Sequence, residues 1–317
     1  MDNIKNKKIL IYGTGAVGGY YGGMLVKAGY DVTFIARGKN LEVLKEKGLT
    51  LIREDEKEVF PICVTETVHG LLQQKDFDYI LICVKSKDTK DAALNVKSKV
   101  NANTTVVSFQ NGVDNEDIIA SVIGEEFVIS GLVFVASKLI EPGVVYQFGY
   151  NGGMIGELYK SEKTERVFTL QKIMQEAGVD CKISDNMRGE LWNKLVWNAA
   201  FNPLSVLTGK TLEKMLAEDF ELIKSIMIEV RDVAIAHGIS IRSDTVEFNL
   251  KRSEGFTGFK TSMLQDFEVG KPLELEQILG VVIKKAKEKN VNVPNSFRIY
   301  SELKEKLSSV VIASRMK

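Results

Sequence analysis

The stretch KILIYGTGAVGGYYGGMLVK, residues 8–27, decides the fold of this chain. It joins an unbroken apolar run to a glycine-rich turn and then to a segment that favours a helix. The turn matches the pattern G-x-G-x-x-G with Gly13, Thr14, Gly15, Ala16, Val17 and Gly18. Between a strand and a helix, this pattern predicts a site for the phosphates of a dinucleotide.

Each glycine of this turn has its own task in a dinucleotide site. Gly13 allows the tight turn, Gly15 lets the backbone approach a pyrophosphate, and Gly18 lets the helix pack closely on the strand. The N-terminus of the helix then offers free N–H groups and partial positive charge to the phosphates. The alternative interpretation is an ordinary glycine-rich turn, and we favour the dinucleotide site.

The residue at the end of the second predicted strand indicates which dinucleotide binds. About 20 residues after the turn, enzymes that use NAD carry an acidic residue for the ribose 2′-hydroxyl. Here the strand ends at Arg37, and no carboxylate lies between it and Glu42. An arginine can pair with a 2′-phosphate through two N–H groups and can stack on adenine. The sequence therefore predicts NADP(H), with a solvated surface arginine as the alternative.

Short β-branched segments alternate with helical stretches through the first half of the chain. The predicted strands are Lys8–Tyr12, Asp31–Ala36, Tyr79–Val84, Thr104–Ser108 and Val128–Val133, with a weaker one at Pro61–Thr65. Several are continuous apolar blocks, as in strands that are buried on both faces of a parallel sheet. Strands that alternate with helices form right-handed crossovers. We therefore expect an α/β domain with a doubly wound parallel sheet.

The last part of this domain is predicted to contain a hairpin. The segment Asn151-Gly152-Gly153 lies between two strand-like runs and is typical of a tight turn. A helix at Glu165–Glu176 and a strand at Val179–Ser184 are expected to complete the sheet.

From residue 185 onward the sequence pattern is helical. The predicted helices are Met187–Phe201, Leu212–Ala236, Val246–Lys251, Thr257–Phe267, Glu276–Lys289 and Ser296–Ser308. Pro203 and Gly238 are expected to end two of them. We therefore predict an N-terminal Rossmann domain at residues 1–184 and a C-terminal all-helical domain at residues 185–317, with the ligand in a cleft between them.

The composition excludes several classes of protein. Lys plus Arg and Asp plus Glu both number 42 among the 317 residues, so the chain lacks the positive charge that attracts nucleic acid or an anionic membrane. No apolar run is long enough for a membrane span, and no signal peptide is recognised. Cys63, Cys83 and Cys181 have no metal-ligand spacing. We interpret them as reduced, buried thiols of a cytoplasmic protein without a metal site.

The first helix of the second half carries a polar stripe on an otherwise apolar segment. Glu190, Lys194, Asn198 and Asn202 recur every four residues, which places them on one helix face. A surface pair of Glu190 and Lys194 would explain two of the four. It would not explain two amides among aromatic residues, because buried amides need partners. We therefore expect the stripe to line a ligand cleft.

The reduction of a carbonyl group requires a proton donor as well as a hydride. The two histidines are poor candidates, since His237 precedes Gly238 at a helix end and His69 lies in a loop-like segment. A lysine among apolar groups can serve instead when desolvation lowers its pKa. Lys194 is the best-placed candidate.

Together these motifs resemble the ketopantoate reductase family (2-dehydropantoate 2-reductase), a member of the 6-phosphogluconate-dehydrogenase-like group of reductases. The resemblance covers nearly the whole chain. It rests on the segments GTGAVG at 13–18, CVKS at 83–86, QNG at 110–112, RGELWNKL at 188–195, NPL at 202–204, TSMLQD at 261–266 and GKPLELE at 270–276.

The resemblance implies that NADPH reduces 2-dehydropantoate to (R)-pantoate, in the biosynthesis of pantothenate and coenzyme A. Lys194 would be the general acid and Glu274 its partner. The carboxylate and hydroxyl of the substrate would be held by Asn111, Asn198, Asn202 and Ser262. Asn111 would also contact the cofactor, and Lys85 would lie near the nicotinamide. The residues alone predict otherwise for two of these: an exposed turn carboxylate at Glu274 and a helix-surface serine at Ser262.

The chain departs from the family pattern at three places. Asp88 stands where relatives often have an uncharged polar residue near the cofactor, Phe259 replaces a polar group near the substrate, and residues 210–216 diverge. The substrate therefore stays open between 2-dehydropantoate and another branched 2-oxo or 3-hydroxy acid. A non-catalytic NADP(H) sensor is a third alternative, although it should have lost Lys194 or Glu274. A small-molecule 2-oxo acid is the expected partner, and a homodimer stays open.

Overall fold

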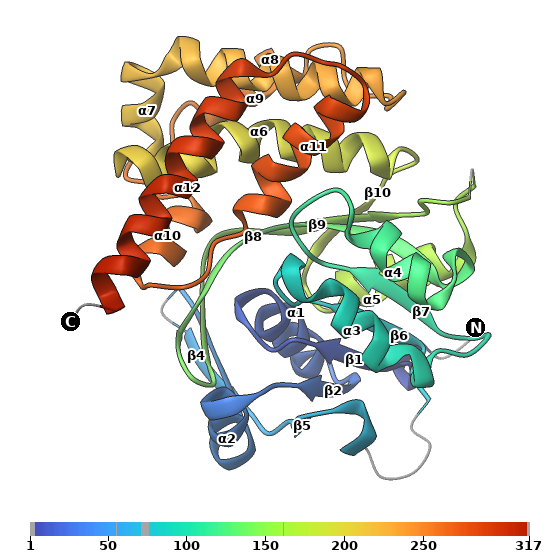
Figure 1. The fold of residues 1–317 in the computed structure, drawn as a ribbon. Helices are drawn as coiled ribbons and strands as arrows, with labels where there is room; N and C mark the ends of the chain where they lie inside the picture. The colour runs from blue at the N-terminus through green and yellow to red at the C-terminus, as the bar shows by residue number, and fades with distance from the viewer. Residues whose placement is uncertain (1–3, 55, 71–75, 161, 316–317) are drawn as a thin grey trace. The chain divides into compact units, whose positions relative to one another are not determined.

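Figure 1 shows the computed structural model, which describes residues 4–54, 56–70, 76–160 and 162–315. The chain divides into two compact units, Met1–Met187 and Arg188–Lys317. The first unit is a β-sheet with helices packed against it, and the second consists of helices. The predicted domain boundary after residue 184 lies close to this division.

A parallel sheet forms the centre of the first unit. Neighbouring strands follow the order β8-β7-β6-β1-β2-β5, and each pair in this series is parallel. The strands are β1 (Lys8–Tyr12), β2 (Asp31–Ile35), β5 (Cys63–Thr65), β6 (Tyr79–Ile82), β7 (Thr105–Ser108) and β8 (Val128–Glu141). The chain leaves β1 toward β2 on one side and later returns to its other side with β6. The predicted doubly wound fold is thereby confirmed.

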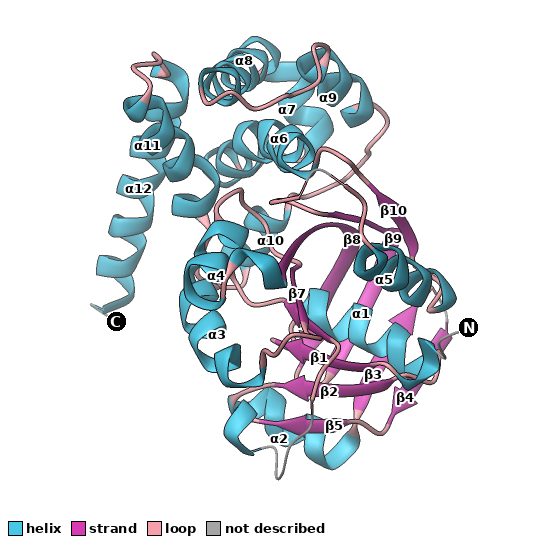
Figure 2. Ribbon diagram, turned by 90° about the vertical axis from the view of Figure 1, so that its right-hand side faces the viewer, coloured by secondary structure: helices cyan, strands magenta, loops and turns pink. Residues whose placement is uncertain are grey.

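Alternate residues of the central strands enter two different cores. Ile9 and Ile11 of β1 pack with α1 (Ala16–Lys27), whereas Leu10 packs with Ile80 of β6 and with α3 (Thr89–Val96) and α4 (Asn115–Ile123). Both faces of β1 are therefore buried, which explains its continuous apolar run. Figure 2 shows α3 and α4 side by side on one face of the sheet and α1 on the other.

The predicted hairpin exists, but its turn lies at a different place. β8 pairs antiparallel with β9 (Val144–Gly156), and the chain turns at Pro142-Gly143 rather than at Asn151-Gly152-Gly153. Proline presets the backbone of a turn and Gly143 has a positive φ of 76°, a combination that suits a tight turn. Gly152 and Gly153 instead lie inside β9, where a Cβ at Gly152 would come within 2.7 Å of the Tyr150 ring.

Two strands that the sequence did not predict extend the sheet beyond β9. β3 (Leu49–Arg53) pairs parallel with β9, and β4 (Glu56–Phe60) pairs antiparallel with β3. α2 (Gly38–Lys47) precedes them. α5 (Glu165–Glu176) and β10 (Asp180–Ile183) complete the unit, with β10 parallel to β9. The alternating charges of β4 suit an edge strand that faces water on one side.

The second unit is helical, as expected, but several helix boundaries differ from the predicted ones. Its helices are α6 (Met187–Thr208), α7 (Leu212–Glu218), α8 (Phe220–Ala236), α9 (Thr245–Ser253), α10 (Ser262–Glu268), a π-helical turn at Glu276–Gly280, α11 (Val281–Glu288) and α12 (Pro294–Arg315). The predicted helix at 212–236 is broken at Asp219, which separates α7 from α8. α10 begins five residues later than the predicted Thr257, because Gly258 has a positive φ and Thr261 caps the helix.

Pro203 does not end α6, contrary to the prediction. The helix continues to Thr208 with the proline inside it. The hydroxyl of Ser205 donates to the backbone oxygen of Asn202 at 2.7 Å, and Thr208 donates to that of Leu204 at 2.9 Å. Leu204 and Val206 are buried, so packing and side-chain hydrogen bonds outweigh the backbone hydrogen bond that proline removes.

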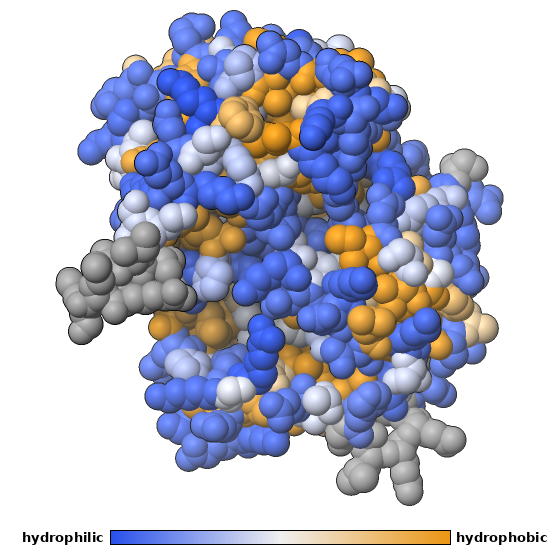
Figure 3. Space-filling view, in the orientation of Figure 1, coloured by the Kyte–Doolittle hydropathy of each residue, from blue (hydrophilic) through white to orange (hydrophobic). Residues whose placement is uncertain are grey.

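The surface shows one further correction. Cys181 is buried and Cys83 is partly buried, but Cys63 is exposed, because it begins the edge strand β5. The expectation of three buried thiols is therefore wrong for Cys63. On the face drawn in Figure 3, hydrophilic residues predominate and hydrophobic ones form separate patches. Within the described ranges, no helix is sufficiently long and apolar to span a membrane.

A buried carboxylate joins α8 to the start of α12. Glu229 accepts hydrogen bonds from the backbone N–H groups of Asn295 and Ser296 at 2.9 and 2.8 Å. It also accepts from their side chains at 2.9 and 2.6 Å. The first amides of a helix have no partner within the helix and carry partial positive charge. Glu229 therefore caps α12 from a neighbouring helix.

We expect Glu229→Gln to lower the free energy of unfolding by about 1–3 kcal/mol, since its NH2 group replaces one of the two accepting oxygens and cannot accept from the donors that face it. Urea denaturation followed by circular dichroism measures the change. Glu302→Gln, on an exposed position of α12, is the matched control and should stay within about 0.5 kcal/mol of wild type. Equal losses for the two variants would contradict the capping role.

Candidate active site

The residues predicted to bind the cofactor follow four adjacent strands of the first unit. The glycine turn follows β1, Arg37 follows β2, Lys85 follows β6 and Asn111 follows β7. Because these strands are neighbours and parallel, their carboxyl ends lie at one edge of the sheet. The strand order reverses between β1 and β6, and the crevice at such a switch point is where open α/β sheets bind ligands.

The glycine turn is held by the neighbouring strand. The backbone N–H groups of Gly13 and Thr14 donate to the oxygen of Ile35 at 3.2 and 3.1 Å, and the Thr14 hydroxyl donates to the same oxygen at 2.9 Å. A Cβ at Gly18 would lie 2.1 Å from the Gly13 oxygen, so only glycine permits this close packing. Gly13 itself has a φ of 105°, which other residues rarely adopt.

Gly15 differs from the other two glycines of the motif. A Cβ placed on it would meet no atom within 4 Å, so the space beside it is open. Gly15 is also the N-cap of α1, where the first helical amides have no partner within the helix. This open space beside unpaired N–H groups fits a pyrophosphate.

Arg37 meets a carboxylate that the sequence around it did not reveal. Its guanidinium lies 3.1 Å from the carboxylate of Asp88, which comes from the segment after β6. The side chain of Arg37 is 81% exposed, so most of its N–H groups still face water. A 2′-phosphate can therefore reach Arg37, but it would have to share that residue with Asp88.

Lys85 and Asn111 belong to two segments that hydrogen bonds tie together. The side-chain amide of Gln110 donates to the backbone oxygen of Val84 at 3.0 Å and to the Thr89 hydroxyl at 2.8 Å. The hydroxyl of Ser86 donates to the backbone oxygen of Asn111. The structure thus brings the Lys85 and Asn111 segments together, with Lys85 exposed and Asn111 partly buried.

In the second unit, α6 carries the amides of the polar stripe. Asn198 is 7% exposed, and Asn202 is 1% exposed. Within the described part of the chain, the Asn198 side chain makes no hydrogen bond and the Oδ1 atom of Asn202 has no partner. Buried polar atoms in native proteins are nearly always paired, so the Asn202 oxygen indicates a polar group that the described residues do not supply. No polar atom of Asn198 is both fully buried and unpaired, so Asn198 supports this only by its place on the same helix face.

Lys194 lies one helical turn before Asn198 and is partly buried. Burial and, to a lesser extent, the charge of Arg252 lower its pKa, the carboxylate of Glu274 raises it, and the net result is a pKa lowered from 10.5 to about 8. Desolvation disfavours a charged ammonium group, which explains the direction of the shift. Near neutral pH the residue is therefore mostly protonated but can lose its proton readily.

Glu274 differs from the expectation that the residues alone supported. It is 8% exposed rather than a solvated turn carboxylate, and it precedes the π-helical turn at Glu276–Gly280. Such turns are frequent at functional sites. Its charge acts on Lys194, so the structure brings the two residues together within the helical unit. The signal for Glu274 came from the family motif and not from periodicity.

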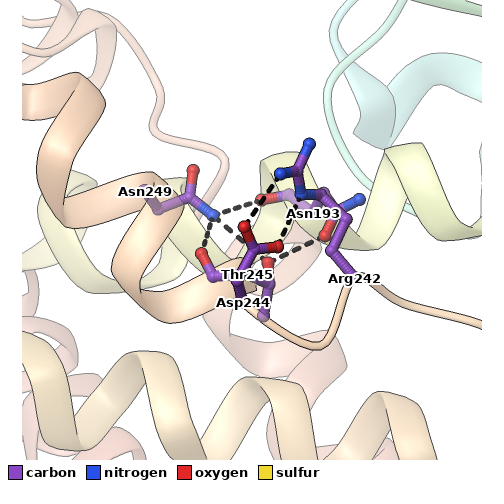
Figure 4. Close-up of polar contacts among 5 residues, drawn as sticks. All are labelled: Asn193, Arg242, Asp244, Thr245 and Asn249. Carbon is purple, nitrogen blue, oxygen red and sulfur yellow. Dashed lines mark hydrogen bonds and ion pairs between the residues drawn. The ribbon is translucent and has the colours of Figure 1, made fainter.

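Helix α9 is fastened to α6 beside Lys194, and Figure 4 shows part of this contact. The Thr245 hydroxyl donates to Oδ1 of Asn193 at 2.7 Å, and the Asn249 side chain donates to the backbone oxygen of Asn193 at 3.2 Å. One turn further along both helices, Trp197 Nε1 donates to the Ser253 hydroxyl at 2.8 Å. Arg252, which sequence analysis did not single out, is carried to Lys194 by this contact.

Ser262 is exposed at the first position of α10, as the residues alone suggested. The preceding residue, Thr261, shares a hydrogen bond of 2.6 Å with Ser205, which also donates to the backbone oxygen of Asn202. The start of α10 therefore lies near the Asn202 end of α6.

The histidines occupy positions that suit structural or solvated residues. His237 ends α8 and its Nε2 atom lies 2.9 Å from the backbone oxygen of Lys285, while His69 is exposed in a short turn. Among the residues that the structure describes, no group of three or more His, Cys, Asp or Glu side chains could hold a metal ion.

Comparison with known proteins agrees with this geometry. Residues 9–160 match the family model "Ketopantoate reductase PanE/ApbA", and residues 186–307 match "Ketopantoate reductase PanE/ApbA C terminal". The 2-dehydropantoate 2-reductase of Mesorhizobium japonicum is 31% identical over 299 residues, which cover 87% of this chain and 90% of that protein. The 2-dehydropantoate 2-reductase of Pyrococcus horikoshii is 31% identical over 95% of this chain and 98% of its own.

A solved structure shows the same likeness in three dimensions. The crystal structure of 2-dehydropantoate 2-reductase from Methylococcus capsulatus superposes with a TM-score of 0.85 at 33% identity and covers 98% of both chains. Sequence and structure thus agree over both units. The chain belongs to the ketopantoate reductase family and is an oxidoreductase.

Proposed function

We propose that this chain reduces 2-dehydropantoate to (R)-pantoate with NADPH, and that Lys194 supplies the proton. Family membership supports the reaction, and two relatives are named 2-dehydropantoate 2-reductase. The observation that carries the mechanism is Lys194, a lysine whose pKa is lowered to about 8, on the same helix as two buried amides. A non-catalytic sensor would have no need of this arrangement.

The first unit supplies the residues for the cofactor. The open space beside Gly15 and the N-terminus of α1 fit the pyrophosphate, and Arg37 would pair with the 2′-phosphate. Lys85 and Asn111 follow the adjacent strands and would contact the nicotinamide side. When bound, the reduced nicotinamide supplies a hydride for the 2-oxo carbon.

The second unit supplies the residues for the substrate. Lys194 would donate its proton to the oxo oxygen, so that no alkoxide accumulates, and Glu274 would orient the ammonium group. Asn198 and Asn202 would hydrogen-bond the substrate, with Ser262 and Asn111 completing its contacts. A substrate would then satisfy the Asn202 oxygen, which has no partner among the described residues.

The general acid can be tested by the pH dependence of kcat. Lys194 acts in its protonated form, so we expect kcat to be maximal below a pH of about 8 and to fall as pH rises through that value. Lys194→Ala should lower kcat by about 10²-fold or more and abolish the alkaline decline. The rate is followed by the absorbance of reduced nicotinamide, with 2-dehydropantoate beside other branched 2-oxo acids.

Lys214→Ala, at an exposed position of α7, is the control for the loss of one lysine and should keep the wild-type profile. If Lys194→Ala keeps a near-normal kcat, another residue is the proton donor, and Lys85 is the next candidate.

Arg37 should determine the preference for NADPH. Arg37→Ala is expected to weaken NADPH binding by about 1–3 kcal/mol, the value of a charge-assisted hydrogen bond, and to leave NADH binding nearly unchanged. Asp88→Asn should act in the opposite direction and tighten NADPH binding by up to about 5-fold, since an exposed ion pair contributes little. Fluorescence titration of both cofactors measures these changes. If Arg37→Ala weakens NADH and NADPH equally, the assignment to the 2′-phosphate is wrong.

The amides of α6 should bind substrate and not stabilise the core. Asn198→Ala and Asn202→Ala are expected to raise KM for the 2-oxo acid by about 2- to 13-fold, which corresponds to one neutral hydrogen bond. Their thermal unfolding should resemble that of wild type. Asn295→Ala, whose carboxamide donates to Glu229, should instead lose stability and keep KM. If an Asn198 or Asn202 variant loses stability and keeps its KM, that asparagine stabilises the core and does not bind the substrate.

A further inference from the structure

Arg252 is an exposed cation near Lys194 that pairs with no other residue in the described part of the chain. Its Cζ atom lies 6.0 Å from the ring centroids of both Trp197 and Phe248. Trp197 is the residue one turn after Lys194 on α6. Across the described ranges, Arg252 takes part in no hydrogen bond and no ion pair. No carboxylate among these residues therefore neutralises the charge of this guanidinium.

A second arginine on the same aromatic ring, Arg242, is paired with a carboxylate and serves as a comparison. Arg242 lies over the same Phe248 ring, with its Cζ atom 4.0 Å from the ring centroid. It binds the carboxylate of Asp244 through two N–H groups, both at 3.0 Å (Figure 4). Arg252 has the same kind of aromatic neighbour but lacks the carboxylate. Two parallel N–H donors are the geometry that arginine uses to bind carboxylates.

The position of Arg252 relative to Lys194 is set by the packing of α9 on α6. Hydrogen bonds from Asn249 to Asn193 and from Trp197 to Ser253 lie one turn apart along this contact. Arg252 stands directly before Ser253, so it is fixed at the level of Trp197. Its guanidinium lies 6.0 Å from the ring centroid of Trp197, three residues after Lys194, and its charge lowers the pKa of Lys194.

The charges around Lys194 favour an anionic ligand. Lys194 and Arg252 are cations, and Glu274 is the carboxylate that acts on Lys194, so these three groups together carry one net positive charge. The carboxylate of a 2-oxo acid is bonded directly to its oxo carbon. A site that gives a proton to the oxo oxygen and also binds the carboxylate therefore needs two donors close to each other.

Resting on the proposed function, we propose that Arg252 binds the carboxylate of the 2-oxo acid through two guanidinium N–H groups, while Lys194 faces the adjacent oxo oxygen. Trp197 and Phe248 lie beside the guanidinium and favour its charged form by cation–π attraction, while the exposed side chain stays open to an anion. The amides of Asn198 and Asn202 are then left for the hydroxyl and oxo oxygens of the substrate.

The test compares an acid with its neutral counterpart. We expect Arg252→Gln to raise KM for 2-dehydropantoate by about 10- to 100-fold, with a smaller effect on kcat. It should change KM for the lactone of the same acid, which has no free carboxylate, by less than about 2-fold. Lys251→Gln removes one charge from the adjacent, exposed position of α9 and is the matched control. Calorimetric titration with pantoate gives a readout that is independent of turnover.

The Arg252→Lys variant distinguishes the effect of the two parallel N–H groups from that of the positive charge, because lysine keeps the charge and lacks the paired N–H groups. It should keep the alkaline decline of kcat at its wild-type pH, because a cation remains beside Lys194, and still raise KM for the acid. Arg252→Gln should shift that decline to higher pH. The proposal is overturned if Arg252→Gln affects the acid and the lactone equally, or no more than Lys251→Gln does. A wild-type enzyme that reduces no 2-oxo acid would instead contradict the proposed function, and pantoate binding would still decide the role of Arg252.

Discussion

The partial burial of one ammonium group, that of Lys194, is the constraint around which the helical unit is arranged. An ammonium group in apolar surroundings is costly unless other charges and hydrogen bonds compensate. Here Glu274 favours the charged form, while burial and Arg252 oppose it, and the pKa settles at about 8. A structural lysine would gain nothing from this balance, whereas a proton donor requires a pKa near the working pH.

The two units hold their functional groups by different means. In the first, parallel strands bring the glycine turn, Arg37, Lys85 and Asn111 to one edge of a sheet, so backbone hydrogen bonds fix their order. In the second, a four-residue repeat aligns Lys194, Asn198 and Asn202 on α6, and hydrogen bonds from α9 determine what lies beside them. Pro203 inside α6 does not disturb this alignment, since the helix continues to Thr208.

The sequence predicted the parts of the fold and site that depend on local pattern. Three features can be recognised without coordinates: the G-x-G-x-x-G motif, the apolar blocks of β1 and β6, and the four-residue repeat of polar side chains on α6. Contacts between distant segments were missed. Asp88 reaches Arg37 across 51 residues, and α9 carries Arg252 to α6 by means of hydrogen bonds that no local pattern records. The hairpin turn was predicted at the wrong place for the same reason. Gly152 lies within a strand, where a side chain would clash with Tyr150 and with the backbone of Asp180, and it does not form a turn.

The central claim is that Lys194 is a proton donor with a lowered pKa, and its pKa can be measured directly. Nuclear magnetic resonance titration of lysine side chains labelled with ¹³C at Cε, with Lys194→Ala used to assign the signal, reports that pKa. The account predicts a midpoint at a pH of about 8, and a midpoint at higher pH when Arg252 is replaced by Gln. A midpoint near the ordinary lysine value of 10.5 would contradict it.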